Sequence, residues 1–353
     1  MSLSIEQHIS LQPFNSLALP AYAEYFCSVT DKQELLAALD YAREHQLEVT
    51  PLGGGSNLVL AGDLSGLVIY LNIKGFSYSV ADDSVEVTFA AGENWHQGVL
   101  TTLQRGWYGL ENLSLIPGNM GAAPIQNIGA YGVELADLFV SLRAVEIATG
   151  KTCEFDKAAC QFAYRDSLFK NVARDQYIIL DISLRLSTSP AVNISYPALK
   201  TAVDEAGLDN ALTPEAVSQL VIQIRQTKLP DPAVTPNAGS FFKNPVIADS
   251  AVVELHNQYP EMPTYPQPQQ QSKIPAAWLI DQCGFKGVRR GSLGVHKHQA
   301  LVLVNYQTDG GATGEQLLAL AEELRDAVWQ RFAIRLEIEP RVYGQAELAD
   351  GSL

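Results

Sequence analysis

Apolar residues recur every three to four positions in several segments of the chain, a period that predicts amphipathic helices. One such stripe lies between Asp31 and Gln46, where Asp31 followed by Glu34 resembles a capping box. Thr213 followed by Pro214 indicates a second helix start. We expect helices at 31–46, which would be the first element of the chain, and at 94–104, 214–229, 276–283 and 313–330.

Short apolar runs bounded by Gly, Asp or Ser predict strands. In the last of them, Ile334, Leu336 and Ile338 would face one way and the charged residues between them the other. We expect strands at 48–52, 58–60, 67–71, 85–91, 139–147, 177–187, 300–305 and 334–339. Residues 259–275 hold five prolines and must be extended or irregular. A chain of 353 residues allows two or three domains, and a boundary is expected near 190–230.

Two glycine-rich segments fit neither pattern. Residues 114–132, SLIPGNMGAAPIQNIGAYG, are too rich in Gly and Pro for a regular helix and too apolar for an ordinary exposed loop. They form either a buried turn or a backbone surface against a large ligand. GGGSN at 53–57 joins two predicted strands, so its amides can hold phosphates or simply make a tight turn. It matches neither a Walker loop nor a dinucleotide fingerprint. Together the two segments suggest a clamp for a dinucleotide.

Three further clusters are candidates for chemistry. Arg165, in AYRDS, can stabilise negative charge on a carboxylate or can form a surface ion pair. Ser240 lies in NAGSFFKNP without a G-x-S-x-G elbow, so it is a candidate proton donor or a turn residue rather than a hydrolase nucleophile. His296 and His298 have no Asp or Cys at ligand spacing, and we expect no metal site.

The overall charge excludes several partner classes. The formal net charge is −15, which argues against sequence-independent nucleic-acid binding and against anionic membrane surfaces.

None of the four cysteines forms a CxxC pair, as expected of reduced thiols in a cytoplasmic protein. The N-terminus does not read as a signal peptide, and no apolar run reaches the roughly 20 residues that cross a bilayer.

Five motifs in order resemble the UDP-N-acetylenolpyruvoylglucosamine reductase family, from about Leu17 to Gly344. They are PLGGGSNLVL, IPGNMGAAPIQNIGAYG, FAYRDSLFK, KLPDP…NAGSFFKNP and WLIDQCG. The resemblance implies an α+β fold: a two-subdomain FAD-binding fold of the vanillyl-alcohol-oxidase (PCMH) type and a C-terminal α+β substrate-binding domain. It places FAD-binding subdomain 1 at 1–66, completed by 333–353, subdomain 2 at 67–227, and the substrate domain at 228–332.

The family's activity is implied with the fold. NADPH reduces FAD, and the reduced flavin transfers hydride to the vinyl carbon of UDP-N-acetylglucosamine enolpyruvate, giving UDP-N-acetylmuramate for peptidoglycan. The choice of NADPH over NADH rests on the family alone. No His or Cys lies within the two glycine-rich segments, so we expect FAD to be non-covalent. We also expect a monomer, with a nucleotide-sugar substrate and no nucleic-acid or membrane partner.

The resemblance also assigns residue roles. Ser240 matches the proton donor, and Arg165 with Glu339 matches the pair that stabilises an enol-like intermediate. Five residues match substrate contacts: Tyr196, Lys228, Asn244, Tyr265 and Lys273. Tyr196 and the proline-rich stretch resemble the longer form of the family. The glycine-rich segments supply the expected flavin contacts: Gly53, Gly54, Gly55, Ser56, Asn57, Pro117, Gly118, Gly121, Ala122, Gln126, Asn127, Gly129, Ala130, Tyr131 and Gly132.

One departure leaves the carboxylate open. The family usually ends in L-E-P-E-V, whereas this chain reads Leu336-Glu337-Ile338-Glu339-Pro340. Glu339 keeps the matched position, but Glu337 is on the same predicted face. Two other functions also stay open: another FAD-dependent oxidase or dehydrogenase of the same cofactor fold, and a nucleotide-binding protein without catalysis.

Overall fold

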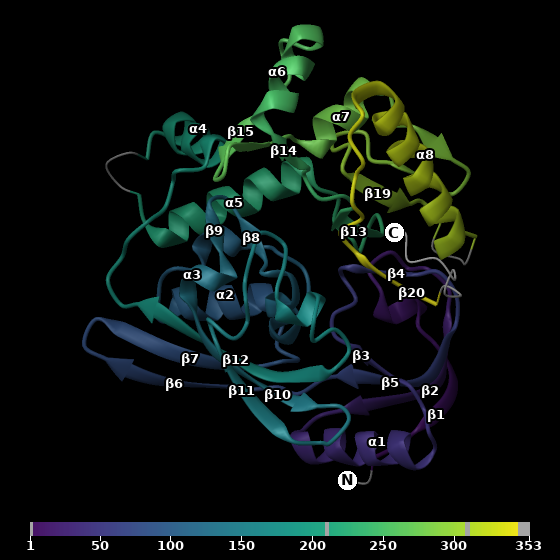
Figure 1. Ribbon diagram of the computed structural model, residues 1–353. Helices are drawn as coiled ribbons and strands as arrows, with labels where there is room; N and C mark the ends of the chain where they lie inside the picture. Colours follow the sequence, from purple (N-terminus) through teal and green to yellow (C-terminus); the bar gives the residue numbers. More distant parts are fainter. Residues whose placement is uncertain (1–2, 209–211, 308–310, 345–353) are drawn as a thin grey trace. The chain divides into compact units, whose positions relative to one another are not determined.

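A computed structural model describes residues 3–208, 212–307 and 311–344, and its contacts divide into two compact units (Figure 1). Unit 1 comprises the described residues of 1–9, 23–54 and 65–227, and unit 2 those of 10–22, 55–64 and 228–353. Each unit is therefore built from three separate segments. The finer division into two FAD-binding subdomains and a substrate domain stays a prediction, and residues 345–353 of its first part lie outside the described residues.

The first sheet of unit 1 has the strand order β1-β2-β5-β3. Its members are β1 (Glu6–Ser10), β2 (Tyr22–Val29), β3 (Val49–Leu52) and β5 (Leu64–Leu71). Helix α1 (Lys32–Glu44) lies along this sheet (Figure 1) and buries Leu35 and Leu39. It begins where the Asp31 carboxylate accepts the Glu34 N–H at 2.8 Å. The predicted helix is confirmed, but the prediction that it comes first is wrong, because β1 and β2 precede it.

The second sheet of unit 1 has the order β11-β10-β12-β7-β6. It contains β6 (Phe76–Ala81), β7 (Ser84–Ala90), β10 (Phe139–Glu146), β11 (Thr152–Asp156) and β12 (Tyr177–Ser187). Helix α2 (Trp95–Gln104) starts at Asn94, whose side chain accepts the Gln97 N–H at 3.0 Å. Phe89, Trp95 and Leu184 lie in one buried core between helix and sheet. The strands expected at 67–71, 85–91, 139–147 and 177–187 are thereby confirmed.

The remaining elements of unit 1 are short or helical. The glycine-rich stretch holds η2 (Glu111–Leu113), η3 (Met120–Gln126), β8 (Gly129–Ala130), β9 (Val133–Glu134) and α3 (Leu135–Leu138), followed by η4 (Leu168–Lys170). Helices α4 (Pro197–Ala206) and α5 (Pro214–Lys228) share a small core with Leu199 and Val217. Of these two helices, only α5 was predicted.

In unit 2 the largest sheet has the order β13-β19-β18-β17, with α8 (Gly314–Phe332) and α7 (Ala276–Gln282) sharing its core. The strands are β13 (Asn237–Ser240), β17 (Arg289–Arg290), β18 (Leu293–Val295) and β19 (Val302–Asn305). Thr313 and Gln316 form a capping box at the start of α8. Unit 2 also contains η1 (Gln12–Phe14), β14 (Val246–Ala248), α6 (Asp249–Gln258), β15 (Tyr265–Gln267) and β16 (Gln271–Lys273).

The expected strand at 334–339 is wrong. This segment is extended and irregular, with one bridge between Ile338 and Phe242. The ladder forms three residues later, where β20 (Arg341–Tyr343) pairs in parallel with β4 (Leu58–Leu60). Pro340 interrupts the run, since proline cannot donate to a ladder. Ile334 and Leu336 are still buried and Arg335 exposed, as the alternation predicted.

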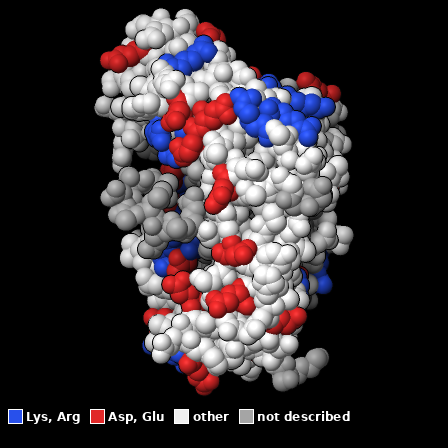
Figure 2. All heavy atoms as spheres, turned by 90° about the vertical axis from the view of Figure 1, so that its right-hand side faces the viewer, with Lys and Arg blue, Asp and Glu red and all other residues white. Residues whose placement is uncertain are grey.

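On the face shown in Figure 2, acidic and basic side chains are interspersed, and several of the basic ones gather in its upper part. Acidic residues of α8 form ion pairs with arginines outside the helix: Arg290 pairs with Glu323 at 2.6 Å, and Arg335 pairs with Asp326 at 3.0 Å. None of the helices formed by the described residues has the length and apolar character needed to span a membrane.

Candidate functional site

Within unit 1, Gly53 and Gly54 at the start of GGGSN lie against the glycine-rich stretch 114–132. A Cβ placed on Gly54 would be 3.0 Å from the Gly118 Cα, so only glycine allows this backbone approach. A Cβ on Gly53 would meet only the Ala122 Cβ, at 3.9 Å. That the two segments together form a clamp for a dinucleotide stays a prediction.

The loop that follows β3 presents unbonded amides. The backbone N–H groups of Gly53, Gly54, Gly55 and Ser56 donate to no other residue in the described part of the chain. Gly55 has φ +60°, a conformation that turns the chain. Successive free N–H groups in such a turn form a cradle for an anion. The residues present therefore fit the diphosphate of a dinucleotide such as FAD.

The Asn127 side chain has a structural role, and its expected contact with the flavin stays a prediction. Its side chain is buried, with its Nδ2 donating to the Glu134 carboxylate at 2.8 Å and to the Ala163 carbonyl at 3.1 Å. Its Oδ1 accepts the Ala136 N–H at 3.0 Å. These bonds hold a left-handed backbone with φ +43°. The side chain thus shapes the glycine-rich stretch from inside the protein.

Arg165 lies against the same stretch, because its Nη2 donates to the Gly129 carbonyl at 2.6 Å. Its backbone is left-handed, with φ +54°, which is costly for a non-glycine residue and is often found at functional sites. The contact places a permanent cation at the edge of the candidate flavin clamp.

A second cation near it was missed by the sequence analysis. Arg225 projects from α5, where its Nε donates to the Leu115 carbonyl at 3.2 Å, and it has no ion-pair partner among the described residues. Burial lowers the pKa of the Arg225 guanidinium; the Tyr131 hydroxyl opposes this shift and the Arg165 charge adds to it. A partly buried cation next to another cation favours an anionic ligand. The sequence analysis did not single out Arg225 because polar residues alternate along this helix and no local motif marks the arginine.

Tyr131 and Tyr196 complete this group, which we call the Arg–Tyr cluster (Arg165, Arg225, Tyr131 and Tyr196). Their rings meet edge to face with centroids 5.4 Å apart. Burial raises the pKa of the Tyr131 phenol, with Arg225 lowering it and Tyr196 raising it further. Tyr196 precedes α4 and is 46% exposed, so its ring can cover a ligand. The structure thus brings three of the predicted site residues, Arg165, Tyr131 and Tyr196, into one neighbourhood.

In unit 2, Ser240 and Glu339 are carried on bonded backbone segments. Ser240 ends β13, and the Glu339 N–H donates to the carbonyl of the next residue, Phe241, at 3.0 Å. Two residues further along each segment, the Lys243 N–H donates to the Glu337 carbonyl at 2.9 Å. These bonds place the backbone of the irregular segment before β20 alongside the residues that follow Ser240.

The structure distinguishes the two carboxylates. The Glu337 side chain is 66% exposed and forms an ion pair with Lys243. Glu339 is half-buried. Glu337 is thus engaged at the surface, and Glu339 stays the predicted catalytic carboxylate.

The other predicted residues of unit 2 occupy different surroundings. The Asn244 Oδ1 accepts the Ala276 N–H at 2.9 Å at the start of α7. Tyr265 and Lys273 lie opposite each other in the β15–β16 hairpin, and Lys228 is exposed at the end of α5. Lys228 and Tyr265 are exposed, and Asn244 and Lys273 are half-buried.

The histidine pair shows no metal-site geometry. The rings of His296 and His298 lie 5.6 Å apart, and burial lowers the pKa of His296, as do His298 and Lys297. Across the described ranges, no group of three or more His, Cys, Asp or Glu side chains is arranged to hold a metal ion.

Two family models match the chain. The "FAD binding domain" model matches residues 23–156, and the model "UDP-N-acetylenolpyruvoylglucosamine reductase, C-terminal domain" matches residues 231–343. The first covers both glycine-rich segments and the second covers Ser240 and Glu339.

Curated relatives match over nearly the full length. UDP-N-acetylenolpyruvoylglucosamine reductases from Pseudomonas fluorescens and Pseudomonas aeruginosa are 45% and 46% identical, each covering 97% of this chain and 100% of the relative. Among solved structures, the reductase of that name from Thermus caldophilus aligns with a TM-score of 0.67 and 22% identity, over 97% of this chain and 100% of the other. That structural likeness shows a shared fold.

Proposed function

The chain belongs to the UDP-N-acetylenolpyruvoylglucosamine reductase family, and on that premise we propose that it reduces the enolpyruvyl ether of UDP-N-acetylglucosamine to UDP-N-acetylmuramate with NADPH. Membership makes it an FAD-dependent oxidoreductase of peptidoglycan synthesis. We further propose that it acts in the cytoplasm, where its four free thiols stay reduced, and as a monomer.

The free amides of Gly53 and Gly54, beside the adjoining Gly118, would hold the FAD diphosphate. When bound, FAD would supply hydride transfer, since it can accept a hydride from NADPH and donate one to the enolpyruvyl group. The chain would bind the dinucleotide through backbone amides, and glycine at these positions leaves room for the ligand because it has no side chain.

The Arg–Tyr cluster would stabilise the charge that develops during reduction. Hydride addition to the vinyl carbon pushes electron density toward the carbon that bears the carboxylate. Arg165 can pair with that carboxylate, and a preorganised cation lowers the barrier to forming the enol-like species. Arg225 would add positive potential for the carboxylate or for the diphosphate of the nucleotide.

Ser240 would then protonate the carbon beside the carboxylate through its Oγ–H. Hydride and proton together convert the enolpyruvyl ether to a lactyl ether. Serine is a very weak acid, so the transfer requires close placement and a neighbouring acid–base group. The observation that supports this assignment is the 3.0 Å bond from the Glu339 N–H to the carbonyl of Phe241, the residue that follows Ser240.

The remaining predicted residues would bind the nucleotide sugar. Lys228 and Lys273 supply cations for its diphosphate on an otherwise acidic chain. Tyr196 and Tyr265, which are 46% and 47% exposed, offer aromatic faces with hydroxyl groups. Asn244 keeps its side-chain N–H₂ for the nucleotide, while its oxygen accepts from Ala276.

The test separates the two half-reactions. Purified holoenzyme is mixed anaerobically with NADPH and then with UDP-N-acetylglucosamine enolpyruvate while the flavin band is followed. We expect bleaching by NADPH and recovery only with the enolpyruvyl sugar. Bleaching without recovery would instead favour an oxidase or dehydrogenase with another substrate.

Ser240→Ala tests the proton donor in the same assay, with Ser250→Ala, an exposed serine of α6, as the matched control. We expect Ser240→Ala to keep NADPH-driven bleaching while slowing reoxidation by about 10²–10⁴-fold, the usual contribution of a general acid. If both half-reactions fell together, Ser240 would be a structural residue and the assignment would be wrong.

A further inference from the structure

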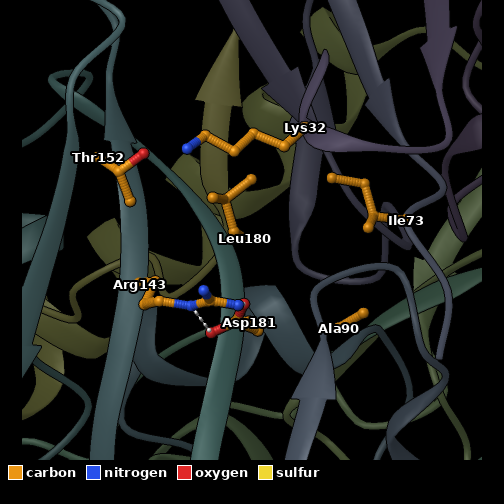
Figure 3. A pocket seen from close by; sticks show the side chains of 7 residues that line it. All are labelled: Lys32, Ile73, Ala90, Arg143, Thr152, Leu180 and Asp181. Atoms are coloured by element: carbon orange, nitrogen blue, oxygen red, sulfur yellow. Dashed lines mark hydrogen bonds and ion pairs between the residues drawn. The ribbon is translucent and has the colours of Figure 1, made fainter. Parts of the chain in front are cut away.

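A pocket of about 240 Å³ opens in unit 1 at the N-terminus of α1, beside the second sheet (Figure 3). None of its lining residues belongs to the predicted flavin or substrate contacts. Ile73, Ala90 and Leu180 give it an apolar side, while Lys32, Arg143, Thr152 and Asp181 give it a polar one. This division matches a small ligand with one apolar and one charged end.

The charges on the polar side do not balance. Asp181 is bound by Arg143, whose Nε donates to it at 3.0 Å and whose Nη2 donates at 2.5 Å. That hydrogen bond and the charge of Asp181 raise the pKa of the Arg143 guanidinium. Among the lining residues Asp181 is therefore paired with Arg143, on which Glu154 outside the lining also acts, whereas Lys32 has no acidic partner.

Lys32 extends along the pocket toward Thr152 (Figure 3). Within the described residues its ammonium has neither a hydrogen-bond nor an ion-pair partner, and the Thr152 hydroxyl is likewise unbonded. The pocket thus presents one uncompensated positive charge and one hydroxyl donor above an apolar wall.

We propose that this pocket binds a small organic carboxylate with a short apolar chain, its carboxylate between Lys32 and Thr152 and its chain against Ile73, Ala90 and Leu180. Lys32 is exposed, so the affinity is modest and falls with added salt. The volume admits a chain of a few carbons and excludes a nucleotide.

The floor of the pocket is joined to the candidate flavin clamp. Ala91, next to Ala90, donates its N–H to the Leu180 carbonyl at 2.7 Å and accepts the Gly121 N–H at 2.9 Å. An occupant would therefore press on backbone that supports Gly121.

The experiment titrates holoenzyme with sodium butyrate by calorimetry, using neutral butyramide as the charge control. We expect a millimolar dissociation constant for butyrate, weaker binding of butyramide, and about two- to fivefold weaker butyrate binding in Lys32→Met, the factor that an exposed ion pair supplies. Lys157→Met, which removes an exposed lysine outside the pocket, is expected to bind butyrate like the parent.

Three results would overturn the proposal: no heat up to 50 mM butyrate, on the order of ten times the expected constant; equal affinities for butyrate and butyramide; or unchanged butyrate affinity in Lys32→Met. Thermal melts of both variants check that each is folded. None of these outcomes depends on the proposed reductase reaction.

Discussion

Alanine at position 54 tests the packing of the two glycine-rich segments. The new Cβ would lie 3.0 Å from the Gly118 Cα and 3.1 Å from the Asn119 Oδ1. Gly54 does not have a left-handed φ, so alanine introduces no backbone strain of its own. The substitution therefore isolates the close approach of two backbones.

The magnitude follows from that distance. Carbon atoms pack best at about 3.5–4.0 Å, so the two segments must part by roughly 0.5–1 Å. Overpacking of this kind costs about 1–3 kcal/mol. At about 2–4 °C per kcal/mol for a unit of this size, Gly54→Ala should melt about 2–12 °C below the parent. If flavin requires the closed arrangement, a strain of about 2 kcal/mol also weakens its binding roughly 30-fold.

Gly53→Ala is the matched control, because its Cβ would make only an ordinary 3.9 Å contact with the Ala122 Cβ. Melting of the flavin-free proteins is followed by circular dichroism, and FAD affinity by quenching of flavin fluorescence. We expect the flavin-free Gly53→Ala protein to melt within about 2 °C of the parent, since surface-type substitutions usually change stability by less than about 0.5 kcal/mol.

The flavin-free melts decide the reasoning, since they cannot be affected by contacts with the cofactor. Equal melting temperatures for the two variants would show that the Gly54–Gly118 approach carries no stability. A normal melt with lost FAD binding in both variants would instead show that glycine is needed only to admit the ligand.

Two further predictions concern the thiols and the carboxylates. Burial raises the pKa of Cys27 and of Cys160 from 9.0 to about 12, so above pH 9 the unfolded chain loses protons that the folded chain keeps. Stability should therefore fall between about pH 9 and 12, at up to about 1.4 kcal/mol per pH unit for each thiol, and Cys27→Ala should flatten denaturant midpoints measured across that range; an unchanged slope would contradict the burial argument. Glu339→Gln should slow reoxidation by the enolpyruvyl sugar at least tenfold while NADPH still bleaches the flavin, whereas Glu337→Gln removes only an exposed ion pair worth about 1 kcal/mol or less and should leave both half-reactions near the parent. The reverse ranking in stopped-flow traces would assign the role to Glu337.

Elements with local signals were predicted well. Helices α1 and α8 have apolar stripes and caps at Asp31 and Thr313, and both begin where those caps lie. Strand β2 was missed although its buried positions partly alternate, because Tyr, Cys and Ser dilute its apolar pattern. The segment at 334–339 shows the reverse case: its alternation gave the correct buried side, but pairing depends on a partner strand that periodicity does not reveal.

The candidate site was predictable only in part. The glycine-rich segments stand out locally, because close backbone approach demands residues without side chains. Arg225 has no such signal, since its importance arises from its distance to Arg165 and Tyr131 rather than from its neighbours on α5. The choice between Glu337 and Glu339 likewise depends on Lys243, which lies 94 residues from Glu337 along the chain.

The three-segment construction of unit 2 has a consequence for synthesis on the ribosome. Ser16 bonds to Asn237 twice, its Oγ donating to the carbonyl at 2.6 Å and its own carbonyl accepting the N–H at 2.9 Å. Residues 10–22 and 55–64 thus leave the exit tunnel long before their partners, whereas unit 1 is complete once residue 227 has emerged. At about 5–20 residues per second, the early segments wait roughly ten seconds or more for the rest of unit 2. During that interval chaperones can bind the two early segments through apolar residues that are buried in the finished protein, namely Leu17, Leu19 and Val59.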